Sequence, residues 1–230
     1  MTRATIVLFD IDGTLLDAKG AGRRAMEAGF AAVTGRADGL AAVRFAGMTD
    51  PQIVRDGLRA VGLPHDPTVV AQVIAAYLER LPAELRVGPP RRLPGVEAVL
   101  ERLRGRDGVA LGVGTGNVEA GARAKLRAAG LDAYFGFGGY GSDHESRAEL
   151  LAVGARRGAA SLGRASHGCR VLVVGDTPRD IAAAHAIGAE CLAVATAFHG
   201  VDELRAAGPS AVVETLATPA AQRWLDEHIA

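Results

Sequence analysis

Two aspartates separated by one residue, Asp10 and Asp12, follow an uncharged apolar run at residues 5–9. The run is rich in β-branched and large apolar residues, which predicts a strand buried on both faces of a parallel sheet. Two carboxylates at the end of such a strand are costly to bury alone, and a divalent cation is their usual partner because hard cations take oxygen ligands. Gly13 then allows a sharp turn that brings backbone N–H groups close to an anion. Together these residues predict a catalytic site, although an isolated Asp-Gly pair would more simply be a turn.

Two further apolar runs also end in residues that could do chemistry. The runs at 109–113 and 171–174 are followed by Thr115, by Asp176 and, four residues later, by Asp180. Each feature has a structural alternative. The threonine could cap the amino end of the next helix, and the Asp-Thr-Pro sequence that starts at Asp176 is a good helix start with proline at its first position.

The string Asp-Ile-Asp-Gly-Thr-Leu at residues 10–15 resembles motif one of the haloacid-dehalogenase-like hydrolase superfamily, whose phosphatase members carry Asp-x-Asp-Gly-Thr-Leu. Residues 109–117 resemble motif two, an apolar strand that ends in a hydroxyl residue. Residues 171–181 resemble motif four, with its two acids four residues apart. The motifs occur in the family's order across nearly the whole chain, which makes the resemblance more specific than one short motif.

Motif three of that family is normally a lysine ahead of the motif-four strand. This chain has only two lysines, Lys19 and Lys125, and neither fits that place. The best candidate is Arg147, because an arginine supplies a fixed positive charge with a forked geometry suited to phosphate. Its acidic neighbours in the sequence leave a surface ion pair as the alternative. We expect the Arg147 side chain to face the phosphate site and to contact Asp180.

The resemblance implies a role for each candidate residue. Asp10 would be the nucleophile that forms an aspartyl-phosphate, and the Asp12 carboxylate would protonate the leaving group and then activate water. Magnesium would be held by the Asp10 carboxylate, the Asp12 backbone carbonyl and the Asp176 carboxylate. Asp180 would orient the motif-three cation, cap a helix or join the metal shell. The phosphoryl group would be bound by Gly13, Thr115, Gly116 and Arg147.

The elements that must position these residues follow an α/β pattern. Strands are predicted near residues 109–113, 170–174, 191–195 and 211–213, and they alternate with helices, as in a parallel sheet covered on both faces. The fold class expected from this pattern and from the resemblance is therefore α/β, with a Rossmann-like core.

The alternation stops between residue 22 and about residue 84. Here the sequence predicts only amphipathic helices, near residues 23–33, 51–61 and 67–81. We expect a Rossmann-like core of residues 1–17 and 91–230 and an inserted all-helical cap of residues 18–90. In the resembled family such an insertion covers the catalytic site.

Composition restricts the class of protein further. The chain of 230 residues is 49% apolar and has a formal net charge of zero, which argues against nucleic acid and anionic membranes as partners. The first apolar run is the predicted catalytic strand rather than an export signal, and no later run suits a membrane span, so a cytoplasmic location is expected. Cys169 and Cys191 border apolar runs and are expected to be buried apolar residues. The sequence carries no signal for the oligomeric state.

The expected activity is magnesium-dependent hydrolysis of a small phosphorylated metabolite, of the phosphoglycolate or sugar phosphate class. Asp12 argues against dehalogenation, because haloacid dehalogenases lack the second aspartate, and Gly22 stands where phosphonate-cleaving members need a lysine. The alternatives are a sugar phosphomutase, which would need a cap arginine where residues 47–50 carry an acid, and a non-catalytic binding module. The cap side chains that could contact a substrate anion are those of Arg44, Thr49 and Arg55.

Overall fold

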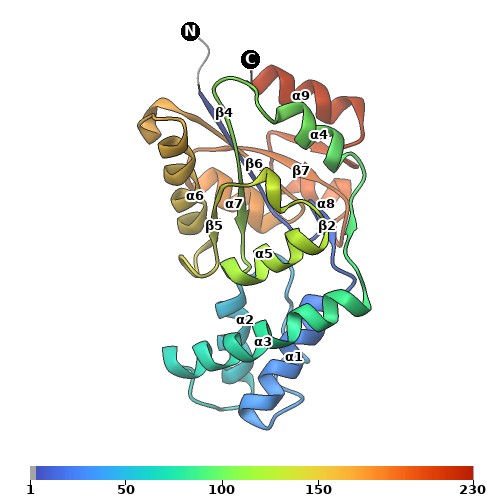
Figure 1. Cartoon of the computed structure of the whole chain (residues 1–230), viewed down its shortest axis with the longest axis vertical. Helices are drawn as coiled ribbons and strands as arrows, with labels where there is room; N and C mark the ends of the chain where they lie inside the picture. The colour runs from blue at the N-terminus through green and yellow to red at the C-terminus, as the bar shows by residue number, and fades with distance from the viewer. Residues whose placement is uncertain (1–3, 230) are drawn as a thin grey trace.

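A six-stranded parallel sheet forms the centre of the computed structural model, which describes residues 4–229 (Figure 1). Its strands lie in the order β5-β4-β1-β6-β7-β8. From β1 the chain runs outward through β4 and β5 on one side and through β6, β7 and β8 on the other. In such sheets ligands bind beyond the carboxyl ends of the strands, where the strand order reverses. The strands are β1 (Thr5–Phe9), β4 (Val109–Thr115), β5 (Phe137–Tyr140), β6 (Arg170–Gly175), β7 (Glu190–Val194) and β8 (Ala211–Val213).

Strand β1 is buried along its whole length between two apolar layers. Val7 and Phe9 belong to one layer, and Ile6 and Leu8 belong to the other. The first layer is completed by α4 (Val96–Leu103), α5 (Glu119–Ala128) and α9 (Pro219–Ile229), and the second by α6 (Arg147–Ser161), α7 (Pro178–Ala186) and α8 (Val201–Ala206). The prediction of an α/β fold with helices on both faces of a parallel sheet is confirmed.

Three helices lie in the insertion that separates β1 from β4 along the chain, at the lower end of Figure 1. They are α1 (Ala21–Thr34), α2 (Asp50–Ala60) and α3 (Pro67–Val87). Most of their buried apolar residues form a cluster of their own, which Val118 joins from the loop before α5. The chain enters and leaves this insertion through a two-stranded antiparallel ribbon of β2 (Leu16–Asp17) and β3 (Arg91–Arg92). The exact boundaries of the predicted cap, residues 18–90, remain a prediction.

The third helix of the insertion is longer than expected. The sequence predicts its end near residue 81, but α3 continues through Pro82 to Val87. Leu81 and Leu85 are both buried, four residues apart on one helical face. Continued burial of this face accounts for the extension through a residue that normally ends a helix.

Strand β5 is absent from the sequence-based expectation because two of its four residues are glycines. A Cβ at Gly139 would lie 1.8 Å from the carbonyl oxygen of Leu150. The glycine therefore lets α6 pack directly on the strand backbone, which a pattern of side chains cannot reveal. Two short 3-10 helices, at Asp132–Tyr134 and Ser166–Gly168, complete the described structure.

Within residues 4–229 no helix combines the length and the apolar character needed to cross a membrane. Cys169 and Cys191 are both buried, as predicted.

Candidate active site

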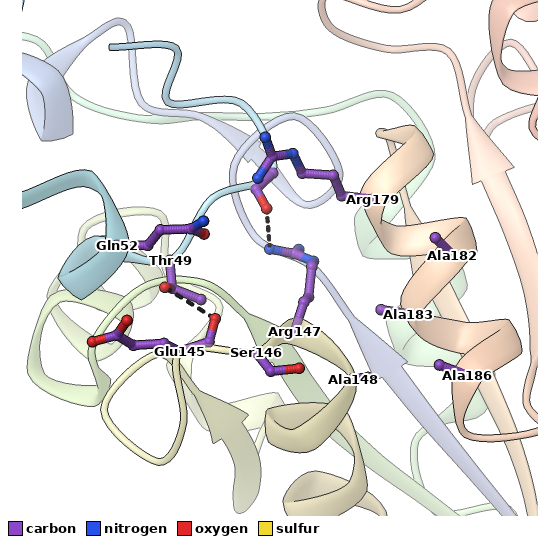
Figure 2. A pocket seen from close by; sticks show the side chains of 11 residues that line it. Thr49, Gln52, Glu145, Ser146, Arg147, Ala148, Arg179, Ala182, Ala183 and Ala186 are labelled. Atoms are coloured by element: carbon purple, nitrogen blue, oxygen red, sulfur yellow. Dashed lines mark hydrogen bonds between the residues drawn. The ribbon is translucent and has the colours of Figure 1, made fainter. Parts of the chain in front are cut away.

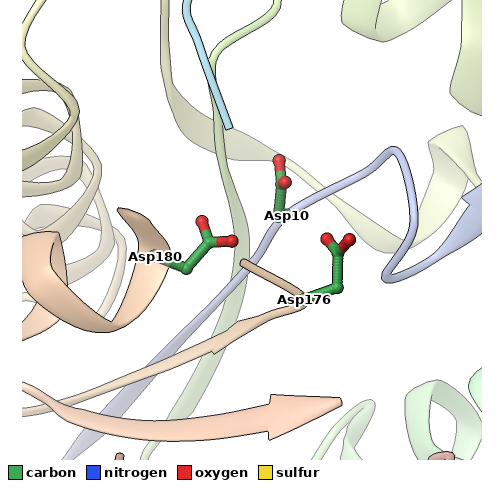
Figure 3. A group of neighbouring side chains, drawn as sticks. All are labelled: Asp10, Asp176 and Asp180. Carbon is green, nitrogen blue, oxygen red and sulfur yellow. The ribbon is translucent and has the colours of Figure 1, made fainter. Parts of the chain in front are cut away.

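Three buried carboxylates meet at the carboxyl edge of the sheet: Asp10, Asp176 and Asp180 (Figure 3). Asp10 directly follows β1, Asp176 follows the neighbouring strand β6, and Asp180 lies in the first turn of α7. One ligand oxygen from each lies within 4.8 Å of the other two. The parallel pairing of β1 with β6 therefore brings together acids that are more than 160 residues apart in the sequence.

Burial disfavours the ionised form of these carboxylates. It raises the pKa of Asp10 from 3.8 to about 6, with Arg147 opposing the shift and Asp180 adding to it. Burial and the neighbouring acids Asp180 and Asp10 also raise the pKa of Asp176 well above its usual range. A divalent cation would relieve both effects, and an all-oxygen donor set is the kind that magnesium takes. The residues present therefore fit such an ion.

The turn after Asp10 is shaped by Gly13 and Thr14. Gly13 has a φ of +87°, and a Cβ at this position would lie 2.3 Å from Oδ2 of Asp176. Only glycine allows both this conformation and this close approach. The Thr14 hydroxyl donates a hydrogen bond of 3.1 Å to Oδ1 of Asp176. The turn thus holds Asp176 toward Asp10, which explains the Asp-Gly-Thr part of the motif.

Arg147 enters the cluster from the first turn of α6. Its Nη2 lies 2.8 Å from Oδ2 of Asp10, and its Nε donates a 2.6 Å hydrogen bond to Oδ1 of Asp180. The contact with Asp180 is the one predicted from the sequence. Burial opposes the charge of Arg147, but Asp10 and Asp180 raise its pKa above the ordinary value, so the guanidinium remains charged. Nη2 is buried without a well-aligned hydrogen bond, and so a donor is left for an anionic oxygen at this place.

Asp180 combines two of the three roles considered for it. Its Oδ1 binds Arg147, while its Oδ2 accepts hydrogen bonds from the Thr177 backbone at 3.0 Å and from the Thr177 hydroxyl at 2.7 Å. The bond from the Thr177 backbone and a reciprocal bond of 3.3 Å from the Asp180 N–H to the Thr177 hydroxyl form a capping box at the start of α7. Asp180 therefore fixes the helix and orients the arginine with the same carboxylate.

Asp12 lies in a different environment. Its side chain is 41% exposed, and its Oδ2 accepts hydrogen bonds from Nδ2 of Asn117 at 2.8 Å and from Nζ of Lys125 at 2.5 Å. Asn117 Nδ2 also donates to Oγ1 of Thr115 at 2.9 Å. The structure thus joins Thr115 to Asp12 through Asn117.

The insertion covers this edge of the sheet. The backbone N–H of Asp50 donates to the carbonyl of Gly116 at 2.8 Å, and the Asp50 carboxylate accepts from the N–H of Val118 at 2.8 Å. A Cβ at Gly116 would lie 2.1 Å from the carbonyl oxygen of Met48. Gly116, predicted as a phosphate-binding residue, is therefore also the point where the loop before α2 approaches the core.

Two of the cap residues expected to reach a substrate anion also contact the core. Thr49 Oγ1 donates to the carbonyl oxygen of Glu145 at 3.3 Å, and Arg55 forms an ion pair with the Glu145 carboxylate. Arg44, the third candidate, is exposed. Thr49 and Arg55 therefore hold the insertion against the start of α6. Thr49 also lines the cavity between these elements, and contact of the three residues with a substrate anion stays a prediction.

Sequence reasoning gave no role to Asn117, Lys125 or Asp50. Asn117 lies at the end of the motif-two segment, and an amide at that place could have indicated a hydrogen bond to one of the site residues. Lys125 is one of only two lysines among 26 lysines and arginines, so a lysine at this position was itself a signal. Asp50 could not be assigned from its position, because its contacts depend on how the insertion docks.

A cavity of about 480 Å³ lies between the loop before α2, the start of α6 and α7 (Figure 2). Alanines of α7 provide an apolar side, and the polar lining comes from Thr49, Gln52, Glu145, Ser146, Arg147 and Arg179. Its lining does not include the three acids of the cluster at the sheet edge. Arg147 belongs to both the cavity and that cluster, so it forms the boundary between them.

Two sequence comparisons agree with this geometry. A family model described as haloacid dehalogenase-like hydrolase matches residues 4–188. The probable phosphatase IndB of Dickeya dadantii (strain 3937) is 31% identical over 234 residues, which cover 91% of this chain and 89% of that protein.

Solved structures show the same fold. A hydrolase from Pseudomonas syringae matches with a TM-score of 0.72 and 21% identity, covering 100% of both chains. The CbbY protein of Rhodobacter sphaeroides, in complex with phosphate, matches with a TM-score of 0.69 and 21% identity, covering 94% of this chain and 96% of its own. The resemblance predicted from the motifs is confirmed, and with it the expectation of a hydrolase. The chain belongs to the haloacid dehalogenase-like hydrolases.

Proposed function

We propose that this protein is a magnesium-dependent phosphatase that hydrolyses small phosphorylated metabolites through a phosphorylated Asp10. The observation that carries the proposal is the placement of a charged guanidinium, Arg147, 2.8 Å from a buried carboxylate that lies among further acids. A relative named as a probable phosphatase and a structural neighbour bound to phosphate support it.

The first step requires an anionic nucleophile to approach an anionic phosphoryl group. Asp10 is the nucleophile, since it lies at the reversal point of the sheet and beside Arg147. Arg147 binds the phosphoryl oxygens and stabilises their negative charge in the transition state. Such stabilisation by fixed donors is usually the largest single contribution to the rate enhancement. Magnesium, held by the carboxylates of Asp10 and Asp176 and the backbone carbonyl of Asp12, would neutralise charge on the phosphoryl oxygens.

Asp12 serves as the general acid and then the general base. Its carboxylate is more exposed than that of Asp10, and its neighbours are an ammonium and an amide rather than other acids. It protonates the leaving alkoxide in the first step and takes a proton from the attacking water in the second. Thr115 and the backbone of Gly13 and Gly116 complete the phosphate-binding shell.

The substrate class follows from the limited space under the insertion. The loop at residues 47–50 is in backbone contact with the core at Gly116, and Thr49 and Arg55 bind Glu145. A small leaving group, as in phosphoglycolate or a sugar phosphate, suits this covered site. The alternative of a sugar phosphomutase is disfavoured, because Asp50 places an acid, not an arginine, in the loop where that family carries its second phosphate-binding group. We propose a cytoplasmic location for this activity.

The test is a screen of the purified protein against phosphorylated metabolites, with magnesium and with excess chelator. We expect release of inorganic phosphate from one or a few small esters, only with magnesium, and none from Asp10→Asn. Phosphate release that survives the chelator or the Asp10→Asn change would sink the proposal. Conversion of a sugar phosphate to its isomer without phosphate release would favour the mutase.

A further inference from the structure

Lys125 is a buried ammonium group next to the proposed acid–base residue. Its side chain is 6% exposed, although it lies on α5, outside the four motifs that the sequence resembles. Nζ contacts Oδ2 of Asp12 at 2.5 Å and Oδ1 of Asn117 at 2.6 Å. A buried charge persists only where it is paired and hydrogen-bonded, so these contacts are the reason this lysine can be buried.

The surroundings of the ammonium come from both the core and the insertion. Asp50, at the start of α2, is close enough that Lys125 offsets part of the rise that burial causes in its pKa. Gly22, in α1, lies so close that a Cβ there would be 3.1 Å from Nζ. Motif one, α5, α1 and α2 thus converge on one amine, and the absence of a side chain at Gly22 leaves room for it.

The hydrogen bonds around Asp12 fix one orientation of its carboxylate. Both Nζ of Lys125 and Nδ2 of Asn117 donate to Oδ2, and neither donates to Oδ1. The amide orientation of Asn117 is set as well, since its Oδ1 accepts from Lys125 while its Nδ2 donates to Asp12 and Thr115. A carboxylate as exposed as that of Asp12 would otherwise sample several rotamers.

We propose that Lys125 is a positioning residue for the reaction: it holds Oδ2 of Asp12 so that Oδ1 faces the leaving-group oxygen and later the attacking water. This inference rests on the proposed function. It assigns Lys125 a task separate from that of Arg147, which contacts Asp10 and Asp180 and not Asp12. The alternative is that Lys125 only stabilises the fold as a buried ion pair.

The leaving group distinguishes the two possibilities. An acid is needed when the leaving group is a poor one, and hardly needed when it is a good one. We therefore compare kcat/KM of wild type and Lys125→Met for benzyl phosphate, which has a poor leaving group, and for 4-nitrophenyl phosphate, which has a good one. Because acid–base catalysis is worth about 10²–10⁴-fold, we expect the loss for benzyl phosphate to exceed that for 4-nitrophenyl phosphate by about 10-fold or more.

Arg127→Met, on the same helix, is the matched control, since Arg127 is a surface residue whose ion pair is with Asp132. It should leave both rate constants near those of the wild type. Equal losses for the two esters in Lys125→Met would overturn the proposal, because a general disturbance of the fold affects both alike. The double variant Lys125→Met/Asp50→Asn also removes the buried acid at α2 whose charge Lys125 offsets, so it provides the same comparison if the single variant folds poorly.

Crystal structures of the wild type and Lys125→Met provide a readout that does not depend on activity. We expect an ordered Asp12 carboxylate in the wild type and a displaced or multiply oriented one in the variant, with Asp10 and Asp176 unmoved. If the wild type hydrolyses neither these esters nor any phosphorylated metabolite of the screen, the proposed function fails, and these structures alone decide the positioning role. An unchanged Asp12 orientation in the variant would then overturn it.

Discussion

Asp10 and Asp12 are the same residue type, two positions apart, yet the fold places them in opposite environments. The Asp10 side chain is 8% exposed and faces two further carboxylates and one guanidinium. The Asp12 side chain is 41% exposed and faces an ammonium and an amide. Within residues 4–229 no second acid is hydrogen-bonded to its carboxylate.

Under the proposed function, this difference lets one short motif supply both the nucleophile and the acid–base group. Asp10 is held by the sheet, where β1 lies between β4 and β6, and its environment is suited to a cation and a phosphoryl group. Asp12 lies beyond the sheet edge, where α5 and the insertion provide its neighbours. The first environment is built by core residues, and the insertion reaches it through the carbonyl of Gly47, which accepts from Arg147 at 3.5 Å. The second environment depends on α5 and on the docking of α1 and α2.

The largest effect is expected from Asp10→Asn. Loss of the nucleophile should lower kcat for 4-nitrophenyl phosphate by more than about 1,000-fold, as for nucleophile removal in other covalent mechanisms. Steady-state phosphate release with magnesium measures this. A kcat within 10-fold of the wild type would show that another residue is the nucleophile. The distinction drawn between the two aspartates would then be wrong.

Asp12→Ala should cost about 10²–10⁴-fold in kcat, the range of general acid–base catalysis. Its backbone carbonyl is retained, so magnesium binding should persist, whereas Asp176→Ala should abolish it. Isothermal titration with magnesium, in the absence of substrate, separates the two variants. The division of roles is wrong if Asp12→Ala loses the ion and Asp176→Ala keeps it.

Arg147→Ala should lower kcat by about 10²–10³-fold, as when one fixed donor is removed from a developing charge. The control is Arg156→Ala, an exposed position on the same helix, which should be nearly silent. Arg157 is unsuitable as a control, because it binds Gly138 and Asp143 and so anchors the loop before α6. Near-normal kinetics in Arg147→Ala would refute its assignment as the motif-three cation.

The smallest effect concerns the free energy of unfolding and comes from Asp50, which lies near Lys125 in the surroundings of Asp12. Burial raises the pKa of Asp50 from 3.8 to about 6, so the folded state holds a proton that the unfolded chain releases at lower pH. The wild type therefore loses stability from this group as the pH rises from about 4 to about 6. Asp50→Asn cannot ionise, and relative to wild type it should gain about 2–3 kcal/mol across this window.

Urea unfolding of both proteins at about pH 4 and about pH 7 provides the measurement. Other titrating groups contribute equally to both proteins, so the change in their difference isolates Asp50. A difference that stays constant with pH would show that Asp50 is not buried against the core in solution.

The acidic cluster was largely predictable because it depends on local sequence and on one strand pairing. The run before Asp10 predicts a buried strand, and the acid after β6 is brought beside it by the parallel register that pairs Phe9 with Val174. The resemblance to motif three gave the expected direction of the Arg147 side chain, and the structure shows the expected contact with Asp180.

The surroundings of Asp12 were not predictable in the same way. Lys125 lies ten residues beyond Thr115, and its reach to Asp12 depends on the path of α5 across the sheet edge. The neighbour Asp50 depends on docking of the insertion, which no local pattern encodes. The glycines of β5 concealed a strand because a missing side chain leaves no periodic signal, and one of them, Gly139, is needed for α6 to pack on the strand.

The ribbon of β2 and β3 affects how the insertion can change during evolution. Its two strands are antiparallel neighbours, so the ends of the chain segment between them are only about 5 Å apart. A segment whose ends meet can be lengthened, shortened or replaced by recombination without changing the path of the sheet. The protein can therefore inherit its reaction from one ancestor and its choice of substrate from another.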